Sequence, residues 1–199
     1  MWLTIFDPLC TVSSVLFCCI AVKLIDDTLD KDYDSKVEYH NFATTLGPGA
    51  MVYAILSLAL AASINASISI PLFLASYSIG MFHDVKQLFP SGLSGLQESV
   101  GTFFIGVLLW GWQSMLFSIL FIFSIQLFDD YIDIHRDQCA GYRNYAHRMG
   151  KVECLLLSIL TLLLSWQIDE HLFPFVFFST LLFYSAIWYY QRRSSSCCH

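Results

Sequence analysis

Seven apolar runs occupy most of the 199-residue chain, and they constrain its fold more than any other feature. Hydrophobic residues make up 56% of the chain and charged residues only 13%, about half the charged share of a soluble domain. A membrane-spanning helix needs about 20 mostly apolar residues. We therefore predict an all-α integral membrane protein, a bundle of about seven transmembrane helices near 4–25, 49–69, 71–86, 98–112, 113–128, 152–168 and 172–191.

The ten Lys and Arg residues give this threading an orientation. With the N-terminus outside, all of them fall within or beside the predicted inner segments, which are 26–48, 87–97, 129–151 and the tail after 191. Such a bias is typical of cytoplasmic segments. We therefore predict a multi-pass protein whose acidic loops and C-terminus are cytoplasmic.

A single transmembrane domain is expected over 1–191, with an internal repeat whose halves are about 1–97 and 98–191. The polar residues 192–199 are expected to form a disordered tail. No block of Lys and Arg resembles a nucleic-acid surface, so the lipid bilayer is an expected partner and nucleic acid is not.

Two acidic stretches of equal length each follow an apolar run. Residues 26–47 read DDTLDKDYDSKVEYHNFATTLG, and residues 129–150 read DDYIDIHRDQCAGYRNYAHRMG. The stretches are 103 residues apart and identical at eight positions, including four spaced aspartates, an Asn and the final Gly. A chain that builds the same acidic turn twice is expected to bring the two turns together.

Helical spacing selects three aspartates from each turn. At 100° per residue, positions 0, +3 and +7 lie within about 60° on one face of a helix. Three carboxylates on one face repel one another unless cations lie between them, and oxygen ligands in such number suit Mg²⁺. We therefore predict Mg²⁺ as the cofactor, and as its ligands and the catalytic residues Asp27, Asp30, Asp34, Asp130, Asp133 and Asp137.

Basic residues on the same predicted membrane side point to an anionic substrate. Carboxylates, a divalent cation and Lys or Arg side chains together bind a diphosphate and stabilise its charge as it departs. An aromatic-rich apolar bundle would hold a hydrocarbon tail, and its ring faces suit a carbocation. The predicted substrate is therefore an isoprenyl diphosphate. Candidate diphosphate-binding residues are Lys23, Lys86, Arg136 and Arg143.

A solvated surface loop is the ordinary explanation of one acidic stretch, but two copies with identical spacing argue against it. Asp30-x-Asp32-x-Asp34 also resembles an EF-hand loop. There, however, Ser35 replaces the turn glycine and Asn41 replaces the bidentate Glu. We therefore reject a calcium loop.

Four other polar residues each have two possible explanations. Glu98 is either a functional carboxylate or a favourable charge at a helix N-terminus. Three histidines are candidate bases, but without a nucleophile pattern each is better explained as a polar interface residue: His83, His135 and His147.

Both turns resemble the signatures of the UbiA superfamily of intramembrane prenyltransferases. Its first motif is N-D-x-x-D-x-x-x-D, and residues 26–34 read DDTLDKDYD. Its second is D-x-x-D-x-x-x-D followed by A-G, which matches residues 130–141. Residues 77–86 look like the family's segment between the motifs. The resemblance implies a UbiA-like helical fold whose aspartates bind Mg²⁺ and diphosphate.

The resemblance adds three substrate-binding candidates and shows three departures. The candidates are Asp26, Tyr77 and Lys36. Asp26 stands where the motif has Asn, and the Arg-Pro pairs common after the first motif are absent, with Lys36 and His40 as the nearest polar substitutes. The family is usually described with nine helices, and this chain offers about seven.

The sequence supports one leading hypothesis and two alternatives. The first is a Mg²⁺-dependent membrane enzyme that ionises an isoprenyl diphosphate and transfers the prenyl group to an unidentified acceptor. The second is a UbiA-type terpene cyclase that needs no acceptor, because the substrate's own double bond captures the cation. The third is a non-catalytic membrane protein that binds cations or lipid on a degenerate fold.

Overall fold

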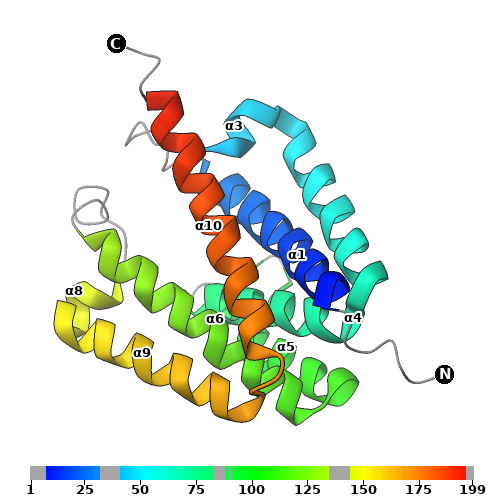
Figure 1. The fold of residues 1–199 in the computed structure, drawn as a ribbon, viewed down its shortest axis with the longest axis vertical. Helices are drawn as coiled ribbons and strands as arrows, with labels where there is room; N and C mark the ends of the chain where they lie inside the picture. Colours follow the sequence, from blue (N-terminus) through cyan, green and yellow to red (C-terminus); the bar gives the residue numbers. More distant parts are fainter. Residues whose placement is uncertain (1–7, 32–40, 83–87, 90, 135–143, 196–199) are drawn as a thin grey trace. The chain divides into compact units, whose positions relative to one another are not determined.

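The computed structural model describes residues 8–31, 41–82, 88–89, 91–134 and 144–195, the last five of them by their backbone alone (Figure 1). These residues form helices and turns, with one isolated bridge between Leu88 and Ser94. The prediction of an all-α chain is therefore confirmed. Five helical stretches in the described part are long and apolar enough to cross a membrane: Pro8–Leu29, Phe42–Phe82, Trp112–Ile132, Lys151–Ile168 and Phe173–Tyr190.

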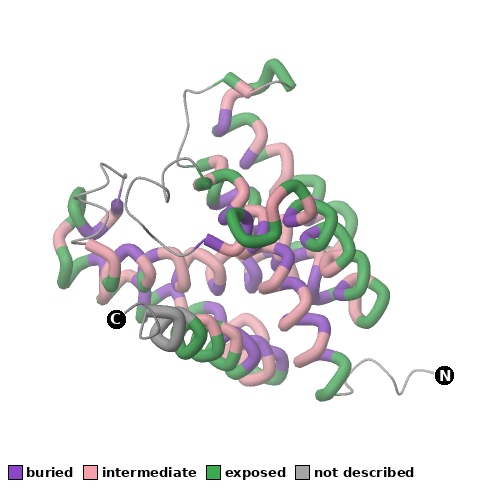
Figure 2. Tube along the Cα trace, turned by 90° about the horizontal axis from the view of Figure 1, so that it is seen from above, coloured by how far each residue is buried: buried purple, intermediate pink, exposed green. Residues whose placement is uncertain are grey.

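Apolar side chains remain exposed along these helices. In Figure 2 exposed and buried positions alternate along the helical turns. Leu108 is 84% exposed, and Phe178 and Tyr189 are also among the exposed apolar residues. Exposed apolar surface on this scale is unfavourable in water and suits lipid. Length, composition and exposure therefore agree with a membrane protein.

The chain divides into two compact units, residues 1–69 with 171–199 and residues 70–170. The helices of unit 1 are α1 (Pro8–Leu29), α3 (Phe42–Leu46), η1 (Gly47–Gly49), the first part of α4 (Ala50–Phe82) and α10 (Phe173–Ser195). Those of unit 2 are the rest of α4, α5 (Gly95–Trp110), α6 (Trp112–Ile132), α8 (Tyr145–Met149) and α9 (Lys151–Ile168). Helix α10 runs to Ser195, four residues beyond the predicted end of the ordered chain.

Helix α4 is broken at Asn65, where the backbone has φ −154° and ψ 89°. Its 33 residues would span about 50 Å if straight, more than the roughly 30 Å of a bilayer core. The break gives the two successive helices that the sequence predicts, but at Asn65 rather than near Pro71. Carbonyls at the break accept from the buried Ser14 hydroxyl of α1, at 2.9 Å from Ala61 O and 3.1 Å from Asn65 O. A side chain of α1 thus satisfies backbone groups that the break exposes.

Unit 2 is built on close contact between α6 and α9. The hydroxyls of Ser124 and Ser158 each donate to the other residue's carbonyl oxygen, both at 2.9 Å. The Cys154 thiol contacts Leu127 O at 3.3 Å. Small side chains let the two backbones approach, and their hydrogen bonds then join the helices. This pairing fixes the end of α6, from which the second acidic turn departs.

Gly106 sets the packing of α5 against α6. A Cβ atom at Gly106 would lie 2.5 Å from the sulfur of the fully buried Met115, whereas one at Gly101, also in α5, would meet nothing within 4 Å. We expect Gly106→Ala to destabilise the protein by about 1–3 kcal/mol through overpacking. Gly101→Ala is the control, and its better helix propensity should leave stability equal or up to about 1 kcal/mol higher. Thermal unfolding in detergent measures both, and equal melting temperatures would contradict this packing.

Candidate functional site

The first acidic turn leaves the end of α1 and returns at α3. Asp27, in the last turn of α1, is 2% exposed. Its carboxylate Oδ2 accepts the main-chain N–H of Phe42 at 2.9 Å, and its carbonyl oxygen accepts Asn41 Nδ2 at 2.6 Å. The Asn41 side-chain oxygen in turn accepts the N–H of Thr44, so Asn41 is also the N-cap of α3.

The second acidic turn has the same construction at the end of α6. Asp130 is 6% exposed, and its Oδ2 accepts the main-chain N–H of Tyr145 at 2.7 Å. Its carbonyl oxygen accepts Asn144 Nδ2 at 2.8 Å. Asn144 caps α8 through hydrogen bonds from the N–H groups of Ala146 and His147. We call each set of hydrogen bonds, Asp27 with Asn41 and Phe42 or Asp130 with Asn144 and Tyr145, an Asp–Asn clip.

Helix boundaries around the two clips recur at the 103-residue offset of the sequence repeat. Helices α1 and α6 end at Leu29 and Ile132, and α3 and α8 are both five residues long. Both short helices end at a glycine with positive φ, 59° at Gly47 and 105° at Gly150. The two turns therefore repeat in local structure as well as in sequence.

Asp30 and Asp133 lie immediately after the helix ends, and both are half-buried. Their N–H groups donate to Asp26 O and Asp129 O, each at 2.9 Å. These are the i→i−4 hydrogen bonds of a helix, so Asp30 and Asp133 continue the last turn of α1 and α6. A common face with Asp34 and Asp137 stays a prediction, because those two residues lie outside the described part of the chain. The arrangement still favours a cation, since carboxylates are added to the negative end of a helix dipole.

Lys23, a predicted diphosphate-binding residue, pairs with a carboxylate. Its Nζ lies 2.8 Å from Asp27 Oδ1, one turn away on α1. In the second turn the matching position is Gln126, which carries no charge. The structure therefore gives Lys23 a role in balancing the buried Asp27.

Tyr77 and Glu98 belong to a hydrogen-bonded cluster in unit 2. The hydroxyls of Tyr77 and Ser91 both donate to the Glu98 carboxylate, which lies in the first turn of α5. Ser94, at the start of α5, forms a capping box with Gln97. The sequence did not predict this cluster, which joins α4, the 91–94 turn and α5.

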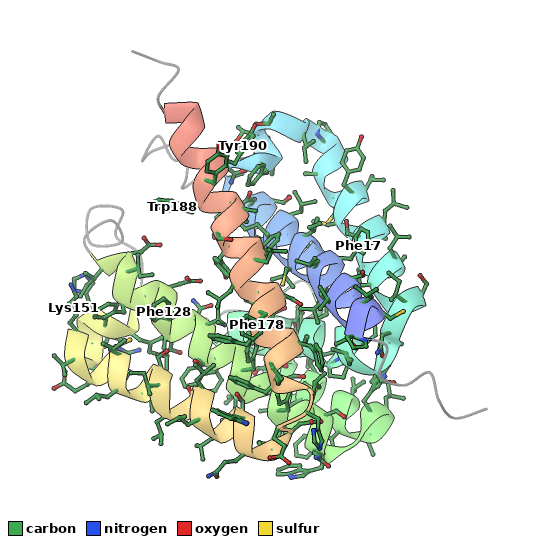
Figure 3. The ribbon with its side chains drawn as sticks, viewed as in Figure 1. Phe17, Phe128, Lys151, Phe178, Trp188 and Tyr190 are labelled. Atoms are coloured by element: carbon green, nitrogen blue, oxygen red, sulfur yellow. The ribbon has the colours of Figure 1, made fainter. Side chains whose placement is uncertain are left out.

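Two aromatic side chains at the second turn have charged neighbours. Lys151 Nζ lies 5.0 Å from the centre of the Tyr131 ring (Lys151 is labelled in Figure 3). Burial of the Tyr145 hydroxyl, and secondly the Asp130 carboxylate, raise the Tyr145 pKa, whereas Arg148 lowers it. At the first turn, Phe42 contacts the ring of Tyr190 from α10 instead, with centroids 5.7 Å apart.

Six predicted site residues lie outside the described part of the chain, namely Asp34, Lys36, Lys86, Arg136, Asp137 and Arg143. The two turns belong to different compact units, so their meeting stays a prediction. Asp26 is exposed at the end of α1.

The residues present fit Mg²⁺ only in part. Within the described ranges, no group of three or more His, Cys, Asp or Glu side chains is gathered as a metal site. Lys23 and the N–H of Phe42 already contact the two carboxylate oxygens of Asp27. Asp30 and Asp133, half-buried carboxylates at helix C-termini, have the donor chemistry that Mg²⁺ takes.

Sequence reasoning found Asn41 and Asn144 as identical residues of the repeat but gave them no function. The available signal was an Asn in front of a short segment in both copies, since Asn is a strong N-cap residue. The chain matches no protein-family model, no curated protein and no solved structure. The resemblance to the UbiA superfamily therefore rests on the motif residues.

Proposed function

We propose that this protein is a membrane-embedded, Mg²⁺-dependent enzyme that ionises an isoprenyl diphosphate and transfers the prenyl group to an acceptor. The observation that carries the proposal is the duplicated acidic turn with its Asp–Asn clip. Each copy sets an aspartate directly after the C-terminus of an apolar helix, Asp30 after α1 and Asp133 after α6. A cation offsets both the carboxylate charge and the helix dipole there.

The residues that would hold Mg²⁺ are Asp30 and Asp133, with Asp34 and Asp137 from the same motifs. When bound, Mg²⁺ supplies positive charge that neutralises the departing pyrophosphate. The basic residues Lys36, Lys86, Arg136 and Arg143 would bind the diphosphate oxygens as hydrogen-bond donors. The carbon–oxygen bond to the diphosphate breaks, its electron pair leaves with pyrophosphate, and the acceptor captures the allylic cation and loses a proton.

Exposed apolar helices support a hydrocarbon substrate. An isoprenyl diphosphate is itself amphipathic, with a charged head and an apolar tail. A charged site at the ends of membrane-spanning helices suits the head while its tail stays in an apolar environment.

Incubation of the purified protein with C10, C15 and C20 isoprenyl diphosphates tests the proposal. We expect Mg²⁺-dependent release of pyrophosphate that rises when a mixture of aromatic and lipid acceptors is added, and no release in EDTA. A cyclic hydrocarbon formed without any acceptor would instead identify a cyclase. No release at any chain length, from protein that unfolds cooperatively on heating, would refute prenyl diphosphate chemistry altogether.

A further inference from the structure

The carboxylates of Asp27 and Asp130 are bound by main-chain groups of the same chain. Both are almost fully buried, at 2% and 6% exposed. Each uses Oδ2 to accept a main-chain N–H fifteen residues further along, from Phe42 and Tyr145 respectively. Such a bond requires only an acceptor oxygen, which an amide provides as well as a carboxylate.

The asparagines complete each clip from the other side. Asn41 and Asn144 donate to the main-chain oxygen of the aspartate fourteen residues earlier and cap the following short helix. Two hydrogen bonds therefore join the residue before each turn to the residues after it. The segment between them carries Asp30 in one copy and Asp133 in the other. Joining the ends of a segment lowers the number of conformations that the residues between them can adopt.

We propose that Asp27 and Asp130 are positioning residues rather than metal ligands: each, with Asn41 or Asn144, ties the end of its long helix to the short helix that follows, and so holds Asp30 or Asp133 in place. This inference rests on the proposed function for the role of the positioned carboxylates. Lys23 neutralises the Asp27 carboxylate through Oδ1, which leaves that side chain fully engaged by protein groups. The same hydrogen bond from the Asn side chain to the Asp carbonyl oxygen occurs in both copies. This repetition argues that the clip is a feature of both turns and not a chance contact in one of them.

Matched substitutions distinguish a positioning role of Asp27 and Asp130 from a role as metal ligands. Asp27→Asn and Asp130→Asn keep an oxygen that accepts the Phe42 or Tyr145 N–H, whereas Asp27→Ala and Asp130→Ala remove it. Asp30→Asn and Asp133→Asn are the reference ligand variants. Two quantities are measured for each protein: the melting temperature in detergent, and the Mg²⁺ concentration for half-maximal pyrophosphate release.

For both Asn variants we expect a half-maximal Mg²⁺ concentration within twofold of the wild type. Asp130→Asn should melt within about 2 °C of the wild type, whereas Asp27→Asn, which also loses the ion pair with Lys23, should melt a few degrees lower. The alanine variants should melt several degrees lower and lose at least tenfold in rate, so that Asn rescues what Ala removes. Asp30→Asn and Asp133→Asn should keep the wild-type melting temperature and require at least tenfold more Mg²⁺. A tenfold increase in the Mg²⁺ requirement of Asp130→Asn, at wild-type melting temperature, would overturn the assignment.

If the wild type is inactive, measurements of stability still test the clip. Absence of pyrophosphate release would refute the proposed function, while the melting temperatures and the hydrogen exchange of the Phe42 and Tyr145 amides still report on the clip. We expect both amides to exchange at least tenfold faster in the alanine variants. If an aspartate variant does not fold, Asn41→Ser and Asn144→Ser keep a capping oxygen and remove only the donor. Unchanged exchange and melting temperature in both Ser variants would show that no clip exists.

Discussion

Substitution of Asp30 or Asp133 by Asn is expected to reduce Mg²⁺-dependent pyrophosphate release about 100-fold or more at a fixed Mg²⁺ concentration. Both residues follow a helix C-terminus, where the carboxylate is added to the negative end of the dipole and a cation is favoured. Electrostatic stabilisation of a departing anion commonly contributes several kcal/mol, and about 1.4 kcal/mol corresponds to each tenfold change in rate. A neutral amide of equal size removes the charge and leaves the shape.

The control for this pair is Glu170→Gln, which also removes one carboxylate. Glu170 is exposed in the turn between α9 and α10, away from both acidic motifs in the sequence. We expect its rate to stay within about twofold of the wild type. A rate for Asp30→Asn or Asp133→Asn as high as that of Glu170→Gln would exclude the substituted aspartate from the chemistry.

Substitution of Asn144 by Ala is expected to have the largest effect on stability. The buried Asn144 side chain donates to Asp130 O and accepts from the N–H groups of Ala146 and His147. Loss of the cap and of a buried donor together costs about 2–4 kcal/mol. For a chain of this size that corresponds to a melting temperature roughly 4–16 °C lower. Thermal unfolding in detergent measures the difference.

Two further variants show whether the loss comes from the clip. Asn144→Ser retains a capping oxygen, so its loss of stability should lie between those of the wild type and Asn144→Ala. Ser185→Ala removes an exposed, local hydrogen bond to Leu182 O and should change stability by less than about 0.5 kcal/mol. If Asn144→Ala behaves like Ser185→Ala, the second turn is not closed as described.

Helices of the expected kind follow directly from the sequence, because long apolar runs have few alternatives in lipid. The break in α4 was expected near Pro71, since proline suits a helix start. It lies at Asn65 instead, where the Ser14 hydroxyl of α1 reaches the carbonyls of Ala61 and Asn65. No local pattern reveals that contact, because it joins residues far apart in the chain.

The acidic turns show the same division between local pattern and tertiary contact. Their repetition and their final glycines were visible as aligned identities, and the structure repeats them as helix ends and positive-φ turns. The common helical face of each trio stays a prediction, because Asp34 and Asp137 lie outside the described part of the chain. The clips were not predicted because Asp27 and Asp130 accept hydrogen bonds from main-chain N–H groups. Every residue except proline has such a group, so the sequence does not indicate which one is bound.

Titration of the purified protein with inorganic pyrophosphate in the presence of Mg²⁺ tests whether the aspartates of both turns bind one diphosphate, as we propose. Isothermal calorimetry gives the number of sites for the wild type, Asp30→Asn, Asp133→Asn and the double variant. We expect one site per chain in the wild type and none in either single variant, with no further loss in the double variant. Two sites in the wild type, with one remaining in each single variant, would show instead that each turn binds a diphosphate of its own.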